Sequence, residues 1–318
     1  MLEKTETSKN DIPKELIVHI QKELESGTET DRSHFALTSR LFHCNQDERL
    51  LLKLLEFVCT GNQIRAQKLL EFRPDLAAKR ASFTDWFGDT LRCSPFEYAL
   101  SDKDLRYMCP MMLDCLPINE EGEDIRIELD NQLKVFEIMG LTCTSSDGKT
   151  YTKTYFSLEP LKQALKTYID NFDNWTWPQR ETHWCTGVGQ AQLRLPAHIR
   201  QHYCDPDESF DGKPTFTKAE FTRSLKFYNY LKNDYESWDK GLTGLGVDFA
   251  MGGSWGAGLL GLMGGMERGD RYRGTIDLAA IAALDEMRTK TDLPLLKQRL
   301  KSPLQKLVAT LESQCVIS

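Results

Sequence analysis

Residues 51–76 read LLKLLEFVCTGNQIRAQKLLEFRPDL, and their apolar side chains recur at helical spacing on both sides of a Gly61-Asn62 turn. We therefore expect two helices joined by a short turn. Residues 94–117, SPFEYALSDKDLRYMCPMMLDCLP, repeat this outline and predict a second helical hairpin. The first hairpin's apolar positions are Leu52, Leu55, Val58, Ala66, Leu69 and Leu70.

Most of the remaining chain also has helical patterns, so we expect a mainly α fold class with some irregular or strand segments. One stretch differs: residues 118–130 are acidic and contain the short alternation Ile125, Ile127, Leu129, which indicates a linker with an extended segment or simply a loop. Pro294 and Pro303 are expected to break the last helical stretch. The predicted helices are 158–172, 196–203, 218–235 and 277–311.

Composition limits the possible classes of protein. The 318 residues predict about two domains. The formal charge of −7 argues against a general nucleic-acid binder, which would carry a basic stripe, so no nucleic-acid partner is expected. Nine scattered cysteines without a CxxC pair favour free thiols in a reducing compartment.

The first predicted helix has one apolar stripe, because Ile12, Leu16, Ile20 and Leu24 follow at spacings of four. IPKELIVHIQKEL followed by FALTSRLFH resembles an F-box. The alternative is a helical hairpin that caps the next domain. The resemblance implies an apolar face for the Skp adaptor of a ubiquitin ligase, made of Ile12, Pro13, Leu16, Ile20, Leu24, Leu37 and Phe42.

The two predicted helical hairpins resemble degenerate ankyrin repeats. Residues 94–99, SPFEYA, lie where an ankyrin repeat has T-P-L-H-x-A. The copies are offset by more than a regular ankyrin period, and the surplus maps to a loop at residues 81–88 that is suited to recognition. Two such repeats need neighbours to complete their core.

Histidines and cysteines gather in one part of the chain, at His183, Cys185, His198, His202 and Cys204. His198 and His202 are four apart and would share one helix face, and zinc accepts two histidines with two cysteines. A Cys185 nucleophile with a histidine base is a second possibility. The favoured interpretation is aromatic packing around Trp175, Trp177 and Trp184, with no metal and no cofactor.

Residues 249–266, FAMGGSWGAGLLGLMGGM, carry no charge over a length near the minimum for a membrane span. Seven of these residues are glycine, which destabilises a helix by about 1 kcal/mol each relative to alanine. We therefore favour a glycine-rich loop or hairpin packed in a domain over a membrane span.

The chain ends Cys315-Val316-Ile317-Ser318, which fits the C-a-a-X prenylation pattern of the farnesyl type. Cys315 has no evident packing role in a polar tail. One prenyl chain binds membranes only marginally, so a second membrane signal is expected.

Residues 191–210 and 277–289 resemble segments of Legionella-type type IV secreted (Dot/Icm) effectors. The resemblance implies a secreted virulence protein that the host prenylates and that lies in the host cytosol and on the cytoplasmic face of host membranes. It would recruit a host Skp–cullin (SCF) ubiquitin ligase to a target as a substrate adaptor, without catalytic residues of its own. The alternatives are a membrane-targeted thiol or metal enzyme in the C-terminal domain and a non-catalytic sequestering protein.

The expected organisation follows from these segments. A flexible tail precedes F-box-like helices, ankyrin-like repeats, a linker, a C-terminal substrate or effector domain and the CaaX tail. The corresponding ranges are 1–10, 11–50, 51–117, 118–150, 151–311 and 312–318.

Overall fold

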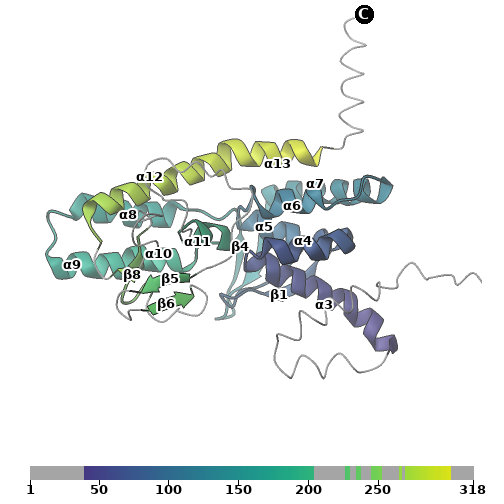
Figure 1. Cartoon of the computed structure of the whole chain (residues 1–318), viewed down its shortest axis with the longest axis horizontal. Coiled ribbons are helices and arrows are strands. Elements are labelled where there is room, and N and C mark those ends of the chain that lie inside the picture. Colours follow the sequence, from purple (N-terminus) through teal and green to yellow (C-terminus); the bar gives the residue numbers. More distant parts are fainter. Residues whose placement is uncertain are drawn as a thin grey trace, which may run out of the picture. The chain divides into compact units, whose positions relative to one another are not determined.

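The computed structural model describes residues 39–203, 226–229, 234–237, 245–252, 265–266 and 269–301 (Figure 1). The chain divides into two units between Arg49 and Leu50. Phe42 belongs to the first helix, of which only the backbone is described there. The other expected Skp-docking residues, together with Cys204 and Cys315, lie outside the described residues.

The predicted first helical hairpin is confirmed. Helix α3 (Ser39–Cys59) is followed by α4 (Gln63–Phe72), and a short 3₁₀ helix, η2 (Pro74–Ala77), comes next. Gly61 makes the turn with a positive φ of 69°, and the Asn62 side chain caps α4 by accepting from the Arg65 N–H at 3.3 Å. Leu55 and Leu70 are fully buried, as the apolar spacing predicts, whereas Leu52 is half-buried.

A four-stranded antiparallel sheet follows, in the order β1-β2-β3-β4. Its strands are β1 (Ala81–Thr84), β2 (Thr90–Cys93), β3 (Leu141–Thr144) and β4 (Thr150–Lys153). Strand β2 pairs with β3 through Leu91↔Cys143, so two hairpins that are distant in sequence form one sheet. The expected loop at residues 81–88 is wrong in its first half, which is strand β1.

The second helical pair is α5 (Pro95–Ser101) and α6 (Met108–Asp114), within the range that the sequence predicts. Ser94 and Glu97 form a reciprocal capping box at the start of α5. This pattern explains why SPFEYA begins a helix.

The expected linker at residues 118–150 is wrong, because α7 (Glu120–Met139) fills most of it. Asn119 caps this helix by accepting from the Gly122 N–H at 2.9 Å, and acidic residues in the first turn favour the positive end of the helix dipole. The alternation was too short to define a strand: Ile127 is exposed, whereas the buried apolar positions recur at helical spacing. They are Ile125, Leu129, Leu133 and Phe136.

The C-terminal region is helical with a small second sheet. Its first helices are α8 (Glu159–Asn171), α9 (Trp177–Thr182), the π-helical η3 (His183–Val188), α10 (Gly189–Leu193) and α11 (Ala197–Tyr203). The sheet has the order β6-β5-β8-β7. Its strands are β5 (Lys226–Asn229), β6 (Asp234–Ser237), β7 (Ala250–Met251) and β8 (Gly265–Met266).

Two of these strands correct the predicted helix at residues 218–235. Where this stretch is described, it forms β5 and the start of β6, which pair antiparallel from Lys226↔Ser237 to Asn229↔Asp234. The ends of the glycine-rich stretch also pair antiparallel, through Ala250↔Met266 and Met251↔Gly265, as its hairpin interpretation predicts.

The last described helices are α12 (Arg271–Met287), the π-helical η4 (Arg288–Asp292) and α13 (Leu293–Leu300), drawn in yellow in Figure 1. The expected break at Pro294 is wrong, because Pro294 lies in the first turn of α13. The π-helical turn η4 comes immediately before α13, and its backbone hydrogen bonds span five residues instead of four. The helix therefore changes its hydrogen-bond pattern next to Pro294, which has no N–H to donate.

Helices α8 and α12 pack across the C-terminal core, which contains Leu161, Leu165, Tyr168, Trp184 and Ile281. The mainly α class is therefore confirmed for the described residues. No helix among them is long and apolar enough to cross a bilayer.

Candidate functional site

The two hairpins of the first sheet end in turns of the same geometry. In the first turn the Asp85 N–H donates to the Asp89 carbonyl at 2.9 Å, and the Gly88 N–H donates to the Asp85 carbonyl at 3.0 Å. The Ser145–Lys149 turn repeats both bonds at 2.9 and 2.8 Å, sixty residues later. Gly88 and Gly148 have φ values of 83° and 80°, which glycine adopts without strain.

The two turns touch one another, since a Cβ added to Gly88 would lie 3.2 Å from the Ser146 Cβ. The second turn therefore supports the first from one side, and this contact positions the side chains that follow.

Asp85 organises the first turn from within. Its Oδ1 accepts from the Phe87 N–H at 2.9 Å and the Asp89 N–H at 3.0 Å, and its Oδ2 lies 3.5 Å from the Tyr98 hydroxyl. Burial raises the pKa of Asp85. The Tyr98 hydroxyl also lies 3.1 Å from Cys59 Sγ, so the turn is joined to α3 and α5.

Lys153 continues this network from strand β4. Its Nζ donates to Asp102 Oδ1 at 3.0 Å and lies 4.6 Å from the centre of the Tyr98 ring. Burial alone would lower the pKa of Lys153, but the Asp102 carboxylate outweighs burial and holds the pKa above its ordinary value. Lys153 is therefore charged at neutral pH.

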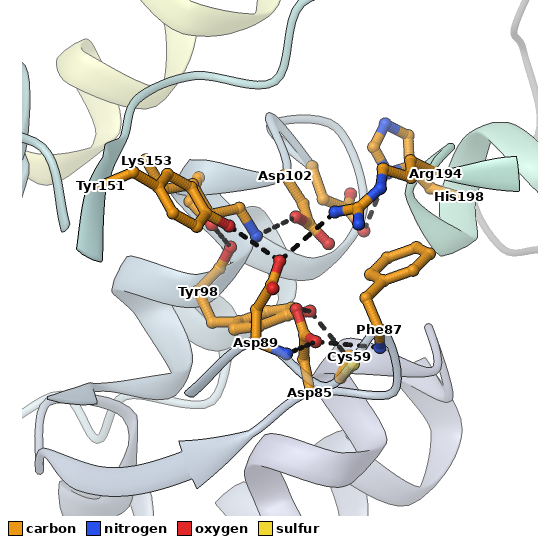
Figure 2. Close-up of polar contacts among 12 residues, drawn as sticks. Cys59, Asp85, Phe87, Asp89, Tyr98, Asp102, Tyr151, Lys153, Arg194 and His198 are labelled. Atoms are coloured by element: carbon orange, nitrogen blue, oxygen red, sulfur yellow. Dashed lines mark hydrogen bonds and ion pairs between the residues drawn. The ribbon is translucent and has the colours of Figure 1, made fainter. Parts of the chain in front are cut away.

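Asp89 links the network to the surface, as Figure 2 shows. Its Oδ2 accepts from the Tyr151 hydroxyl at 2.7 Å and from Arg194 Nη1 at 3.4 Å. The Arg194 guanidinium lies 5.5 Å from the centre of the Phe87 ring. Tyr151 is 39% exposed and the Arg194 side chain 66% exposed. We call Phe87, Tyr151 and Arg194 the tip surface.

A second polar group lies behind the first turn. Trp86 contacts Arg200, whose guanidinium lies 4.5 Å from the ring centre. His198 Nδ1 lies 3.8 Å from Asp104 Oδ2. Burial, reinforced by the charge of Arg288, lowers the pKa of His198 well below its usual value. His198 is therefore a neutral imidazole at physiological pH.

This geometry suits binding better than catalysis at Cys59. Burial raises the pKa of the Cys59 thiol to about 11, so the thiol is protonated at neutral pH and a weak nucleophile. The buried members of the network hold the turn in place, and the tip surface consists of a half-buried aromatic ring with an exposed phenol and an exposed guanidinium. Such groups are enriched in protein interfaces.

A family model described as the CBUA0006 C-terminal domain matches residues 160–300, from the second residue of α8 to the end of α13. A Coxiella burnetii protein described as uncharacterized protein CBUA0006 is 32% identical over 274 residues, which cover 81% of this chain and 77% of the relative. The chain belongs to the CBUA0006 family. No solved structure matches it.

The CBUA0006 C-terminal domain supplies only part of the site. Arg194 and His198 lie within the matched residues 160–300, whereas the turns and their supporting strands precede them. The tip surface is therefore built jointly by that domain and the hairpins before it.

The reactive residues predicted from the CBUA0006-family sequence have two different environments. His183 Nε2 lies 2.9 Å from the Ala164 carbonyl oxygen, and its ring stacks on Tyr168. The Cys185 thiol donates to the Asp248 carbonyl oxygen at 3.1 Å. His202 lies by Tyr107, with ring centres 6.1 Å apart.

Among the residues that the structure describes, no three histidine, cysteine, aspartate or glutamate side chains are placed to hold a metal ion. Trp175 and Trp184 pack around Tyr168, with ring centres 6.4 and 5.0 Å from it, so the predicted aromatic packing is confirmed for these two. Trp177 instead lies at the surface.

Sequence reasoning missed the tip surface and the hydrogen-bond network of Asp85, Asp89 and Lys153 behind it, although one signal was present. Residues 84–90 read TDWFGDT and residues 144–150 read TSSDGKT, both of the form T-x-x-x-G-x-T. A glycine followed by a return to threonine, flanked by short alternating runs, is typical of a tight hairpin turn. The repeat of this pattern after sixty residues predicts two similar hairpins.

Proposed function

We propose that this CBUA0006-family chain is a bacterial effector that acts as an adaptor. Its N-terminal F-box-like segment binds the Skp subunit of a host SCF ubiquitin ligase. Its paired hairpins bind the target protein, and a prenyl group on Cys315 holds the complex at a host membrane. Ubiquitin transfer then comes from the host ligase.

The observation that carries the proposal is the tip surface. Two turns of the same geometry lie side by side in one sheet with helices packed behind them, an arrangement that repeat scaffolds use to present recognition loops. The charged groups of Asp85 and Lys153 bond inside the protein, to backbone N–H groups of the turn and to Asp102 respectively. Tyr151 and Arg194 both bond to Asp89, but they stay 39% and 66% exposed and can contact a partner beside the half-buried Phe87 ring.

Two further points support the proposal. The division of the chain between Arg49 and Leu50 coincides with the end of the F-box-like segment at residues 11–50. The relative CBUA0006 belongs to a bacterium, Coxiella burnetii, as an effector interpretation requires.

The test is calorimetry of the full-length chain with the Skp adaptor. We expect a Kd of about 1 µM or tighter. The double variant Leu16→Ala/Ile20→Ala removes two aliphatic side chains from the predicted stripe and should weaken binding about 100-fold. Val18→Ala is the matched control, because at 100° per residue Val18 faces away from the stripe.

Absence of binding at tens of micromolar, or equal loss in the control, would contradict the Skp-adaptor proposal. The enzyme alternative would then be favoured if Cys185→Ala abolished the protein's effect on host cells without changing its melting temperature. The prenyl group is checked separately: a prenyltransferase reaction should add one farnesyl mass to the wild-type chain and none to Cys315→Ser.

A further inference from the structure

Strand β4 is an edge strand of the first sheet. It pairs with β3 on one side, and none of the described strands lies on its other side. Its first three residues, Thr150, Tyr151 and Thr152, are exposed. An exposed edge strand carries backbone N–H and C=O groups that another extended chain can bond. The free edge of β4 is therefore a place where a further strand can add to the sheet.

The turn before β4 determines which of its backbone groups face that edge. The Ser145 N–H donates to the Lys149 carbonyl oxygen at 2.9 Å, so these two residues form a hydrogen-bonded pair. Bonded and non-bonded pairs alternate along an antiparallel ladder. Tyr151 and Lys153 therefore bond to their partners in β3, and the alternate residues of β4 direct their backbone groups away from it.

These outward-facing residues are Thr150 and Thr152. In the part of the chain that the structure describes, no other element bonds to their backbone groups. Each residue thus offers one donor and one acceptor along the free edge, two positions apart. An extended peptide has donors and acceptors at the same spacing, so it is the kind of partner that this edge fits.

The side chains of β4 leave the edge open. Those of Tyr151 and Lys153 point to the covered face of the sheet, where they bond to Asp89 and Asp102 (Figure 2). Those of Thr150 and Thr152 lie on the opposite face, because successive side chains of a strand alternate. There they lie opposite other threonines of β3, so β-branched side chains of an added strand would continue this surface.

The charges along the edge favour an acidic peptide over a second copy of this chain. Lys149 lies at the start of the edge with its side chain 83% exposed, and β4 itself contains no acidic residue. A second copy added antiparallel about Tyr151 would place its Lys153 beside Lys149, and like charges directly opposite one another are destabilising. Asp147 lies 2.7 Å from Lys149, but an exposed pair of this kind is weak and can be exchanged for a peptide carboxylate.

We propose that the free edge of β4 binds an extended segment of the target protein as an added strand, with β-branched residues beside Thr150 and Thr152 and an acidic residue opposite Lys149. This inference rests on the proposed function, in which the paired hairpins bind the target, and it states how they bind it. Because Tyr151 belongs to both β4 and the tip surface, the added strand lies alongside that surface.

The first experiment is amide hydrogen exchange of the full-length chain, with and without a synthetic peptide Glu-Val-Thr-Val-Thr-Val-Glu. This sequence reads the same in both directions, so either end can lie opposite Lys149. In the free protein, the Thr150 and Thr152 amides should exchange faster than those of Tyr151 and Lys153. At saturating peptide, both threonine amides should exchange about tenfold more slowly, because they then donate to the peptide.

A matched pair of proline variants tests the edge itself. Thr152→Pro removes one outward N–H, which the ladder to β3 does not use, and should weaken peptide binding about tenfold. Ser82→Pro is the control, because the same alternation from the Asp85–Asp89 pair directs the Ser82 N–H to the opposite edge of the sheet. This variant should bind the peptide like the wild type.

A second peptide with lysine in place of both glutamates tests the charge. It should bind the wild type more weakly than the acidic peptide does, and Lys149→Glu should reverse this order. Melting temperatures of all variants show whether a loss of binding reflects unfolding, and the exchange experiment on the wild type needs no variant.

Four outcomes would overturn the inference. They are unchanged exchange at Thr150 and Thr152 with the acidic peptide, equal peptide binding by Thr152→Pro and Ser82→Pro, and equal binding of the two peptides. The fourth is protection of both threonine amides that rises with protein concentration without peptide, because a second copy would then be the occupant. Skp binding is measured through residues 11–50, so either proposal can fail without the other.

Discussion

Arg288 Nη2 donates to the backbone carbonyl oxygen of Asp102 at 2.6 Å, across 186 positions of sequence. Its Nε donates to the next carbonyl, that of Lys103, at 2.9 Å. These carbonyls follow the end of α5, where the helix leaves acceptors without N–H partners. The buried Arg288 guanidinium, directly after α12, therefore binds the C-terminal end of α5, the helix that carries Tyr98.

Replacing this guanidinium should destabilise the protein. Arg288→Met keeps most of the side-chain volume but leaves two buried carbonyls without their donors, so we expect a loss of about 2–4 kcal/mol in the free energy of unfolding. Lys290→Met is the control, because Lys290 is exposed on the same π-helical turn and its loss should be small. Urea unfolding of both variants measures the difference, and similar losses would contradict the role given to Arg288.

The buried neutral imidazole of His198 should make stability depend on pH. Burial and Arg288 lower its pKa in the folded state below the ordinary 6.5, so the unfolded chain binds the proton more readily. Stability is therefore complete above pH 6.5 and is lost as the pH falls toward the folded pKa, by about 1.4 kcal/mol between pH 7.5 and 5.5.

Comparison with His198→Gln isolates this contribution from other titrating groups. The groups facing the imidazole are Asp104, Arg200, His202 and Arg288. All four are retained in the variant, whose unfolding free energy should vary less over the same pH range. Parallel pH profiles of the two proteins would show that His198 is not the group responsible.

The predictability of the fold depended on how local each signal is. The turn at Gly61 and Asn62 was predictable because glycine, the cap and the apolar spacing lie within a few residues of one another. Helix α7 was mistaken for a linker because Ile125, Ile127 and Leu129 alternate over only five positions, while its buried face extends to Phe136.

The site was less predictable, because its parts come together only in three dimensions. Asp89 meets Tyr151 and Arg194 across 62 and 105 positions of sequence, and no local pattern specifies such pairs. Only the repeated T-x-x-x-G-x-T turns gave a sequence signal. The histidine and cysteine spacing suggested one site. His183 instead contacts Ala164 in α8, whereas His202 lies by Tyr107 at the start of α6.

The Cys59 thiol should resist alkylation in the folded protein. With its pKa raised to about 11 by burial, about one thiol in a thousand is ionised at pH 8, and the side chain is 4% exposed. Iodoacetamide labelling followed by peptide mass mapping should leave Cys59 unmodified in buffer and label it in urea. Rapid labelling in buffer would contradict the buried contact with Tyr98.

The contact between the two turns can be measured with a matched pair of glycine substitutions. Gly88→Ala and Gly148→Ala both place a side chain at positive φ, which costs about 1 kcal/mol in the free energy of unfolding. Only at Gly88 does the added Cβ also meet a neighbour, Ser146, at 3.2 Å, whereas nothing lies within 4 Å at Gly148. Gly88→Ala should therefore be the more destabilising of the two.

A third variant shows whether that difference arises from the contact between the turns. Adding Ser146→Gly to Gly88→Ala removes the opposing Cβ, so the double variant should recover the excess loss and leave only the cost of the positive φ. Chemical unfolding of the three variants completes the comparison. If Gly88→Ala and Gly148→Ala are equally destabilising, or Ser146→Gly restores nothing, the turns do not support one another, and the rigid tip surface loses its structural basis.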